Sequence, residues 1–318
     1  MKILVTGGQG FIGSHLVDAL RKEHEVVIID DLSGGFDRNV EGNFWEADCR
    51  DAKDIDRIFA LERPEVVYHL AANAAENKAQ FSPIDVTSRN YSAFINTLTP
   101  FIKYGGKRFI FTSSIAVYGV GQTPFKETDK PEPEDLYGIT KLAAEKTLEV
   151  MSKVHGFEYY IVRPHNVYGP RQNMSDPYRN VVTIWMNALL REKPCYIYGD
   201  GHQKRQFTYI DDVTTHLANL STATEERKIL NVGSESISSI ISLYRALQKV
   251  TGIEEEPVYL SDRPQEVKEA IADNSLVCET PLMEGLKETW KWCQSMGPQE
   301  PIYTDIEIPS KKLPSNWI

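Results

Sequence analysis

The segment MKILVTGGQGFIG, from Met1 to Gly13, decides the fold of this chain. Its first six residues form a short apolar run that ends in glycines, which is typical of a buried parallel strand. From Phe11 to Arg21 the apolar residues recur at helical spacing. A strand, a glycine turn and a helix are therefore expected in direct succession.

The same alternation continues through the first half of the chain. Apolar, β-branched runs predict four further strands, at Glu25–Asp30, Val66–Leu70, Arg108–Thr112 and Tyr159–Val162. Helical patterns predict two helices between them, at Ser88–Tyr104, with Pro100 as a weak point, and at Tyr137–Lys153. Strands and helices that alternate across short turns predict an α/β fold with a Rossmann-like, doubly wound parallel sheet.

The glycine turn has the features of a dinucleotide site. Gly7, Gly10 and Gly13 satisfy GxxGxxG, and Phe11 and Ile12 begin the helix that follows. The glycines permit a tight turn, and the helix N-terminus offers free N–H groups and a positive dipole end to a pyrophosphate. The same pattern could also serve only to pack the strand tightly against the helix.

An acidic residue ends the next strand and decides between these two interpretations. Asp30 lies seventeen positions after Gly13, and its carboxylate can accept both ribose hydroxyls of adenosine while repelling a 2′-phosphate. Adjacent Asp31 could share that role. The sequence therefore favours NAD as the cofactor over NADP.

Three parts are predicted along the chain. Residues 1–165 form an NAD-binding Rossmann domain, with segments returning to it from the C-terminal half. Residues 166–297 form a smaller substrate lobe of irregular loops and shorter elements. Residues 298–318 contain four prolines and no helical period, and are expected to lie extended over the surface or against a partner subunit.

Composition narrows the class of ligand. A net charge of -10 and a pI near 5.3 argue against nucleic acid as a partner, because phosphate-backbone binding requires a basic face. The four cysteines have neither CxxC nor zinc-ligand spacing and are interpreted as buried thiols, so no metal site is expected. No segment has the length of a signal peptide's apolar core or of a membrane span, which favours a reducing cytoplasm and no membrane partner.

With these pieces in place, the sequence resembles the extended short-chain dehydrogenase/reductases, especially UDP-glucose 4-epimerase-like enzymes. The resemblance runs from Met1 to about Trp292, and its motifs are specific in their joint order and spacing. They are VTGGQGFIG (5–13), IDDLSGG (29–35), HLAA (69–72), TSSIAVYG (112–119), YGITK (137–141), RPHNVYGPRQ (163–172) and YGDGHQKRQFTYIDDV (198–213).

The resemblance implies roles for residues that match these motifs. Asp48 is expected to contact adenine, with Cys49 beside it. Small or apolar residues are expected to lie beneath the cofactor, namely Leu70, Ala71, Ala72 and Pro164. For a nucleotide-sugar substrate, the implied residues are Asn166 and Glu266, with Arg205 and Arg263 clamping the diphosphate through their guanidinium groups.

The resemblance also implies a catalytic set. Tyr137 and Lys141 are four residues apart and lie on one helix face. A nearby ammonium and an oxidised nicotinamide would favour the phenolate, so Tyr137 could take a proton from the sugar's 4-hydroxyl while C4 gives hydride to NAD. Ser114 is expected to hydrogen-bond the same hydroxyl. His165 is expected to be satisfied by backbone groups and to shape the nicotinamide pocket.

Several related enzymes carry catalytic residues that this chain lacks, and their reactions are therefore disfavoured. Oxidation and re-reduction at C4 of the sugar remains. Related dehydratases carry an Asp-Glu pair where Ile115 and Ala116 stand, and UDP-glucuronate decarboxylases have a glutamate at the second of these positions. Epimerase/reductases of the GDP-fucose synthase type use a cysteine and a histidine where this chain has Ile115 and Arg171. Ala270 falls where such 4-epimerases gate the sugar's C2 substituent, so an N-acetylated hexosamine could fit as well as a plain hexose.

Two alternatives stay open from sequence. One is another nucleotide-sugar epimerase or a 4-keto reductase, acting on a UDP-uronate or a GDP-sugar. The other is a non-catalytic NAD-binding scaffold, which the survival of Tyr137, Lys141 and Ser114 disfavours. The resemblance further implies a homodimer, in which the Ser88–Tyr104 and Tyr137–Lys153 helices pair between subunits.

Overall fold

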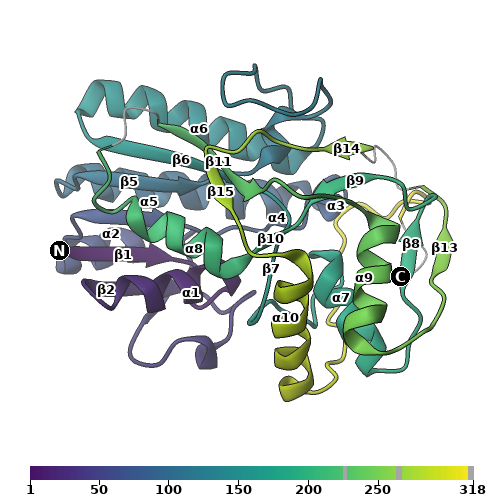
Figure 1. Ribbon diagram of the computed structural model, residues 1–318. Coiled ribbons are helices and arrows are strands. Elements are labelled where there is room, and N and C mark those ends of the chain that lie inside the picture. The colour runs from purple at the N-terminus through teal and green to yellow at the C-terminus, as the bar shows by residue number, and fades with distance from the viewer. Residues whose placement is uncertain (225–227, 263–266, 314–318) are drawn as a thin grey trace.

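The computed structural model describes residues 1–224, 228–262 and 267–313. Its centre is an eight-stranded sheet in which neighbouring strands run parallel (Figure 1). Apolar runs form these strands because helices cover both faces of the sheet. In spatial order the strands are β15 (Leu276–Cys278), β11 (Ile229–Ser234), β6 (Glu158–Pro164), β5 (Arg108–Thr112), β4 (Val66–His69), β1 (Lys2–Thr6), β2 (Glu25–Asp30) and β3 (Trp45–Glu46).

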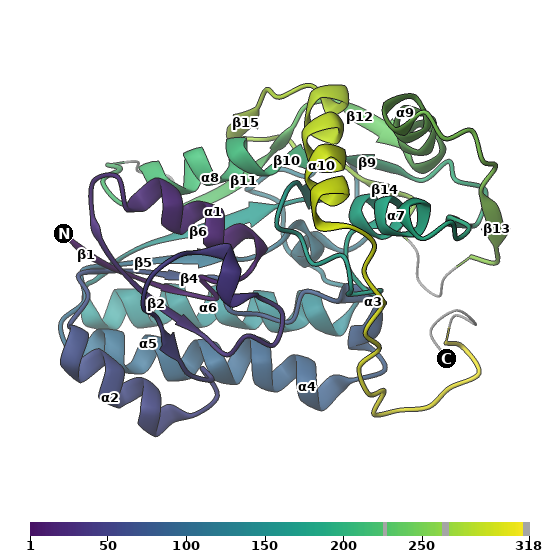
Figure 2. The same ribbon diagram turned by 90° about the horizontal axis from the view of Figure 1, so that it is seen from below.

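The helices lie in two layers, one on each side of the sheet (Figure 2). An apolar cluster that includes Leu16 fills one layer, and a second cluster that includes Phe94 fills the other. On one side lie α1 (Phe11–Leu20) and α8 (Ile210–Asn219), and on the other α2 (Ala52–Glu62), α5 (Ala93–Lys103) and α6 (Leu136–His155). The predicted doubly wound α/β fold is confirmed.

The order of the strands places the functional crevice. The strand order reverses between β1 and β4, which are neighbours in the sheet although β2 and β3 separate them in sequence. In open α/β sheets, ligands bind outside the carboxyl ends of the strands at such a switch point. The ends at Thr6, His69 and Thr112 therefore face the expected site.

Two predicted helices are observed with small differences at their ends. The predicted Ser88–Tyr104 helix begins with a π-helical turn at Ser88–Ser92 and continues as α5, which contains Pro100 without ending there. Helix α6 begins after Asp135, whose side chain accepts a hydrogen bond of 2.7 Å from the Gly138 N–H. It ends at Gly156, which has a φ of 76° and so closes the helix in the left-handed conformation.

The C-terminal half is more regular than the sequence indicated. Strands β11 and β15 and helix α8 return to the central sheet. The short strands of this half agree with the expectation of shorter elements, but three helices that the sequence analysis did not identify lie among them: α7 (Val181–Leu190), α9 (Ile240–Thr251) and α10 (Leu282–Met296). Helix α7 was missed because its buried run VVTIWMNALL is apolar on nearly every side and shows no helical period.

Small sheets and two short helices complete the architecture. Three small sheets hold the lobe together. In the first, β7 (Val167–Tyr168) pairs with β10 (Thr208–Tyr209); in the second, β9 (Lys204–Gln206) lies between β12 (Ile237–Ser239) and β14 (Glu269–Ala270); in the third, β13 (Val258–Leu260) pairs with β8 (Tyr196–Tyr198). The short helices are α3 (Glu76–Ala79) and α4 (Pro83–Thr87). In the described part of the chain, no helix has both the length and the apolar character needed to cross a bilayer.

Candidate functional site

One large pocket, of about 910 Å³, lies at the switch point of the sheet. Its lining residues come from the carboxyl ends of the strands, from α7 and from other segments of the C-terminal lobe. The cofactor residues predicted from sequence all line it: Gly7, Gly10, Phe11, Ile12, Gly13, Asp30, Asp31, Asp48, Cys49, Leu70, Ala71, Ala72, Tyr137, Lys141 and Pro164. Since this list includes Tyr137 and Lys141, the pocket contains both the predicted cofactor residues and predicted catalytic residues.

The glycine turn fits a dinucleotide. Gly7 has a φ of +70°, and a side chain there would place its Cβ 2.8 Å from the Ala71 backbone nitrogen. At Gly13 a Cβ would lie 2.0 Å from the Gly7 carbonyl oxygen. Gly10 caps α1 without any side-chain hydrogen bond, so the first N–H groups of the helix are left for a ligand.

Backbone hydrogen bonds hold the Asp30 carboxylate at the pocket wall. Its two carboxylate oxygens accept hydrogen bonds from the Gln9 N–H at 2.9 Å and the Leu32 N–H at 2.8 Å. Burial raises the pKa of the Asp30 carboxyl, and these backbone donors oppose that rise. Each oxygen keeps a lone pair for a further donor, so the carboxylate can still accept hydroxyl groups.

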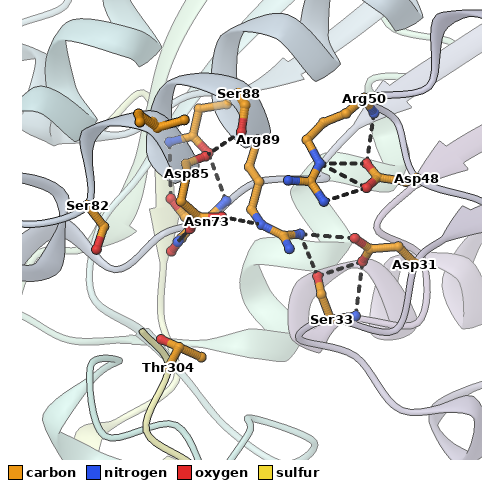
Figure 3. A network of polar contacts seen from close by, with 12 residues as sticks. Asp31, Ser33, Asp48, Arg50, Asn73, Ser82, Asp85, Ser88, Arg89 and Thr304 are labelled. Carbon is orange, nitrogen blue, oxygen red and sulfur yellow. Dashed lines mark hydrogen bonds and ion pairs between the residues drawn. The ribbon is translucent and has the colours of Figure 1, made fainter. Parts of the chain in front are cut away.

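The other two carboxylates predicted for the cofactor site, Asp31 and Asp48, form ion pairs with arginines that the sequence analysis did not identify (Figure 3). Arg89 donates to Asp31 at 2.9 Å and to Asp85 at 2.8 Å, while Arg50 donates to Asp48 at 2.6 Å. The Asp31 carboxylate also accepts from the Ser33 hydroxyl at 2.6 Å. Asp30 is thus better placed than Asp31 to receive ribose hydroxyls.

The expected catalytic residues meet in the same pocket. Lys141, 4% exposed, donates a hydrogen bond of 2.8 Å to the Thr112 carbonyl oxygen and lies 5.8 Å from the centre of the Tyr137 ring. Ser114 lines the same pocket and lowers the pKa of the Tyr137 phenol, and the Ser114 hydroxyl accepts a hydrogen bond of 3.2 Å from the Ala116 N–H. The strand end at β5 and the first turn of α6 bring the three side chains together.

The protein's own groups do not make the phenol acidic. Burial raises the pKa of Tyr137; Ser114 and Arg179 lower it, and the carboxylates of Glu76 and Asp135 raise it further. Burial also lowers the pKa of Lys141 to about 7. Burial is the largest influence on both pKa values, because removing the two groups from water disfavours both charges.

A buried ion pair supports the floor of this site. Arg163 donates to the Glu145 carboxylate at 2.9 Å and 2.6 Å, and both side chains are buried. The Ser113 hydroxyl donates to the same carboxylate at 2.5 Å. Glu145 lies one helical turn after Lys141 on α6, Arg163 lies on β6, and Ser113 directly follows β5, so these contacts fix α6 against the ends of both strands.

The residues expected to bind substrate are only partly described. Asn166 and Arg205 line the pocket, with the Asn166 amide donating to the Gln206 carbonyl oxygen at 3.0 Å and Arg205 donating to the Lys204 carbonyl oxygen at 2.8 Å. Arg263 and Glu266 lie outside the described residues. Ala270 also lines the wall, next to a small apolar cluster.

His165 is buried at the pocket and differs from expectation in its partner. Its Nε2 forms a hydrogen bond of 2.8 Å with the Asn274 side-chain oxygen, not with a backbone group. Burial lowers the pKa of this imidazole. A neutral ring held by an amide is a wall of the pocket rather than a proton carrier at neutral pH.

An asparagine side chain fixes the loop after β4. Asn90 accepts from the Asn73 N–H at 2.7 Å and donates to the Asn73 carbonyl oxygen at 3.1 Å.

The four cysteines are free and buried, and burial raises the pKa of Cys49 to about 12. Among the described residues, no group of three or more His, Cys, Asp or Glu side chains could hold a metal ion.

Comparison with known proteins agrees with this geometry. Residues 3–233 match the sequence profile of the NAD dependent epimerase/dehydratase family. The UDP-glucose 4-epimerase of Mycolicibacterium smegmatis is 31% identical over 308 residues, which cover 91% of this chain and 97% of that protein.

Solved structures extend the comparison. UDP-glucose 4-epimerase of Thermotoga maritima with UDP-glucose superposes with a TM-score of 0.88 at 35% identity, covering 93% of this chain and 99% of its own. UDP-glucuronic acid 4-epimerase of Bacillus cereus, in complex with UDP-glucuronic acid and NAD, gives a TM-score of 0.85 at 29% identity, covering 93% of this chain and 100% of its own.

Proposed function

The chain belongs to the NAD-dependent epimerase/dehydratase family, and on that premise we propose that it is a UDP-sugar 4-epimerase. The observation that carries this proposal is the meeting of Tyr137, Ser114 and Lys141 in the pocket that also contains the glycine turn and Asp30. Acid/base groups for C4 chemistry and a dinucleotide cradle thus share one cavity. UDP-sugars named for the relatives support the choice of substrate class.

In the proposed reaction, Tyr137 takes the proton of the 4-hydroxyl while the C4–H bond breaks. Ser114, which lines the pocket with Tyr137, would hydrogen-bond the 4-hydroxyl and align the proton transfer. Lys141 would hold the nicotinamide ribose, the glycine turn the pyrophosphate, and Asp30 the adenosine ribose. Bound NAD would accept the hydride from C4, return it later to the opposite face, and add the positive charge that lowers the pKa of the phenol.

The second half of the reaction restores every group. The 4-keto sugar rotates within the pocket and presents the opposite face of C4. C4 then regains hydride on that face, and Tyr137 returns its proton to the oxygen. No net oxidation occurs, so the cofactor need not leave. Ile115 and Ala116 line the pocket after Ser114 and carry no ionisable group, which favours this reaction over dehydration.

The charge of the pocket favours a neutral sugar over a uronate. Glu76, Glu134 and Asp135 line the pocket, and the carboxylates of Glu76 and Asp135 are close enough to Tyr137 to raise the pKa of its phenol. A uronate carboxylate would meet like charge there. Ala270, whose small side chain lines the wall, supports acceptance of an N-acetylated hexosamine beside a plain hexose.

A homodimer and a cytoplasmic location remain part of the proposal. On helix α6 the apolar side chains of Ile139, Val150 and Val154 are exposed. Such a stripe suits the helix pairing expected from the resemblance. A sedimentation mass equal to one chain at micromolar concentration would reject the dimer.

A panel of UDP-, GDP-, dTDP- and CDP-sugars, with epimers resolved by NMR, tests the function. Turnover of a UDP-hexose or UDP-N-acetylhexosamine to its C4 epimer is expected, and none is expected for the Tyr137→Phe variant, which should still bind NAD. Turnover only of a uronate or of a sugar on another base would replace the proposal. A scaffold would turn over nothing and show no near-ultraviolet signal of reduced nicotinamide on sugar addition.

A further inference from the structure

The chain that follows α10 runs across the molecule as a strap, defined as residues Gln299–Leu313. It forms no helix or β-strand in its described residues. Figure 2 shows it leaving the end of α10 beside α7 and passing α3. The strap therefore connects the substrate lobe with the helices that follow β4.

The first end of the strap is fixed to the substrate lobe. The Gln299 N–H donates to the Asn187 side-chain oxygen at 2.9 Å, and the Asn187 amide donates back to the Gln299 carbonyl oxygen at 2.8 Å. The Ile302 N–H donates to the Ser175 carbonyl oxygen at 2.7 Å. These partners belong to α7 and to the loop before it, both of which line the pocket.

The second end is fixed to α3 and α4. Lys78 donates to the Thr304 hydroxyl, and the Ile308 N–H donates to the Phe81 carbonyl oxygen at 2.9 Å. The Glu307 carboxylate accepts from the Ile84 and Asp85 N–H groups, each at 2.8 Å. These N–H groups lie in the first turn of α4, where a carboxylate is favoured.

The second anchor joins the cofactor side of the pocket. Asp85, whose N–H Glu307 holds, accepts from Arg89, and Arg89 reaches Asp31 (Figure 3). A chain of direct contacts thus leads from the strap to the carboxylate next to Asp30.

Between its anchors the strap forms part of the pocket wall. Pro301 and Tyr303 line the pocket, and the Tyr303 ring meets the edge of Tyr178, another lining residue, at 6.3 Å between ring centres. Neither strap residue can leave without opening that side of the pocket. A ligand enclosed there would be in reach of the strap.

The strap is held mainly by polar contacts and is therefore easy to release. Of its side chains, only Leu313 packs in an apolar cluster, beside Tyr178 and Phe81. Each hydrogen bond of this kind contributes little to stability, so a segment held by a few of them opens far more often than the core. Lys78, which donates to Thr304, is 3% exposed.

We infer that the strap is a closing element of the site, which opens to admit the nucleotide sugar and closes over it through the contacts of Glu307 and Thr304. The inference rests on the proposed function for its ligand, a UDP-sugar. Closure keeps the 4-keto sugar inside while it turns over. Opening then limits how fast substrate and product exchange.

The test measures dissociation of UDP from the NAD-bound enzyme by stopped-flow displacement. Glu307→Ala removes the hydrogen bonds to the Ile84 and Asp85 N–H groups of α4, and Thr304→Val removes the hydrogen bond from Lys78. Lys311→Ala, at an exposed strap position, is the matched control. Dissociation of UDP should be roughly tenfold faster in the first two variants and unchanged in the control. Equal rates in all four proteins would overturn the inference.

Amide hydrogen exchange in the unmodified enzyme gives an independent readout. UDP should slow exchange at the donors Ile302, Ile308, Ile84 and Asp85. If it does not, in an enzyme that epimerises a UDP-sugar, the strap inference fails and the proposed function stands. If exchange slows but no UDP-sugar is epimerised, the function fails and the strap inference stands; if neither occurs, both fail.

Discussion

The Lys141 ammonium donates a hydrogen bond of 2.8 Å to the carbonyl oxygen of Thr112, at the end of β5. This bond ties the first turns of α6 to the strand whose continuation presents Ser114. It therefore sets Tyr137, one turn earlier on α6, opposite the serine hydroxyl. The catalytic geometry depends on this link between one helix and one strand end.

Burial of Lys141 makes stability depend on pH in the cofactor-free protein. The pKa of this lysine is lowered from 10.5 to about 7, so between these values the unfolded chain binds more protons than the folded chain. The free energy of unfolding should rise with pH across this window, by up to about 1.4 kcal/mol per unit. Denaturant titrations at several pH values measure it.

The variant Lys141→Met provides the control for this effect. It removes the titrating group and should remove that component of the slope, leaving contributions from other residues. A slope that is the same with and without Lys141 would show that the lysine keeps its ordinary pKa in the folded chain.

The buried pair of Arg163 and Glu145 should be strongly coupled. Arg163→Met leaves the Glu145 carboxylate buried with the Ser113 hydroxyl but without its cation, at a cost of about 3–5 kcal/mol in unfolding free energy. The double variant with Glu145→Met should be less destabilised than the two single changes summed. Additive losses in denaturant unfolding would argue that the pair does not interact.

Asp30 should control cofactor choice. Asp30→Asn removes a charged acceptor of ribose hydroxyls and should weaken NAD binding by roughly 10–100-fold, with less discrimination against NADP. Calorimetric titration of both dinucleotides measures the change. Asp54→Asn, on the exposed start of α2, is the matched control and should bind NAD normally. Unchanged NAD affinity in the Asp30 variant would remove the carboxylate from the site.

The acidic side chains near Tyr137 should exclude uronates. Glu76→Gln lowers the negative charge beside the sugar, and the ratio of kcat/KM for UDP-glucuronate to that for UDP-glucose should rise about tenfold. Both substrates are compared in the same preparation. A ratio that stays constant would mean that Glu76 and Asp135 do not face the sugar.

Features of the fold and site were predictable from the sequence where neighbouring residues specify them, and not where the contacting residues are far apart in the chain. The strand, glycine turn and Asp30 were predictable because adjacent residues specify them: periodicity changes at the glycines, and the acidic residue ends the next strand. The pairing of Arg89 with Asp31 joins residues 58 positions apart, and that of Glu145 with Arg163 joins a helix to a strand. No local pattern marks such partners.

The C-terminal half shows the same limit in another form. Helix α7 is buried nearly all round, so its sequence lacks the period that reveals exposed helices. The extended character of the last residues could be read from their prolines. Their position beside the pocket could not, because it depends on Lys78 and α4, more than 200 residues away in sequence.

The central claim is that hydride leaves C4 of the sugar and returns to the same carbon. A UDP-hexose deuterated at C4, incubated with the enzyme in ordinary water, tests it most directly by NMR of the epimer mixture. The account predicts that the deuterium stays on C4 in both epimers and that C3 and C5 exchange no hydrogen with solvent. Loss of the C4 deuterium to water, or inversion at a neighbouring carbon, would contradict it.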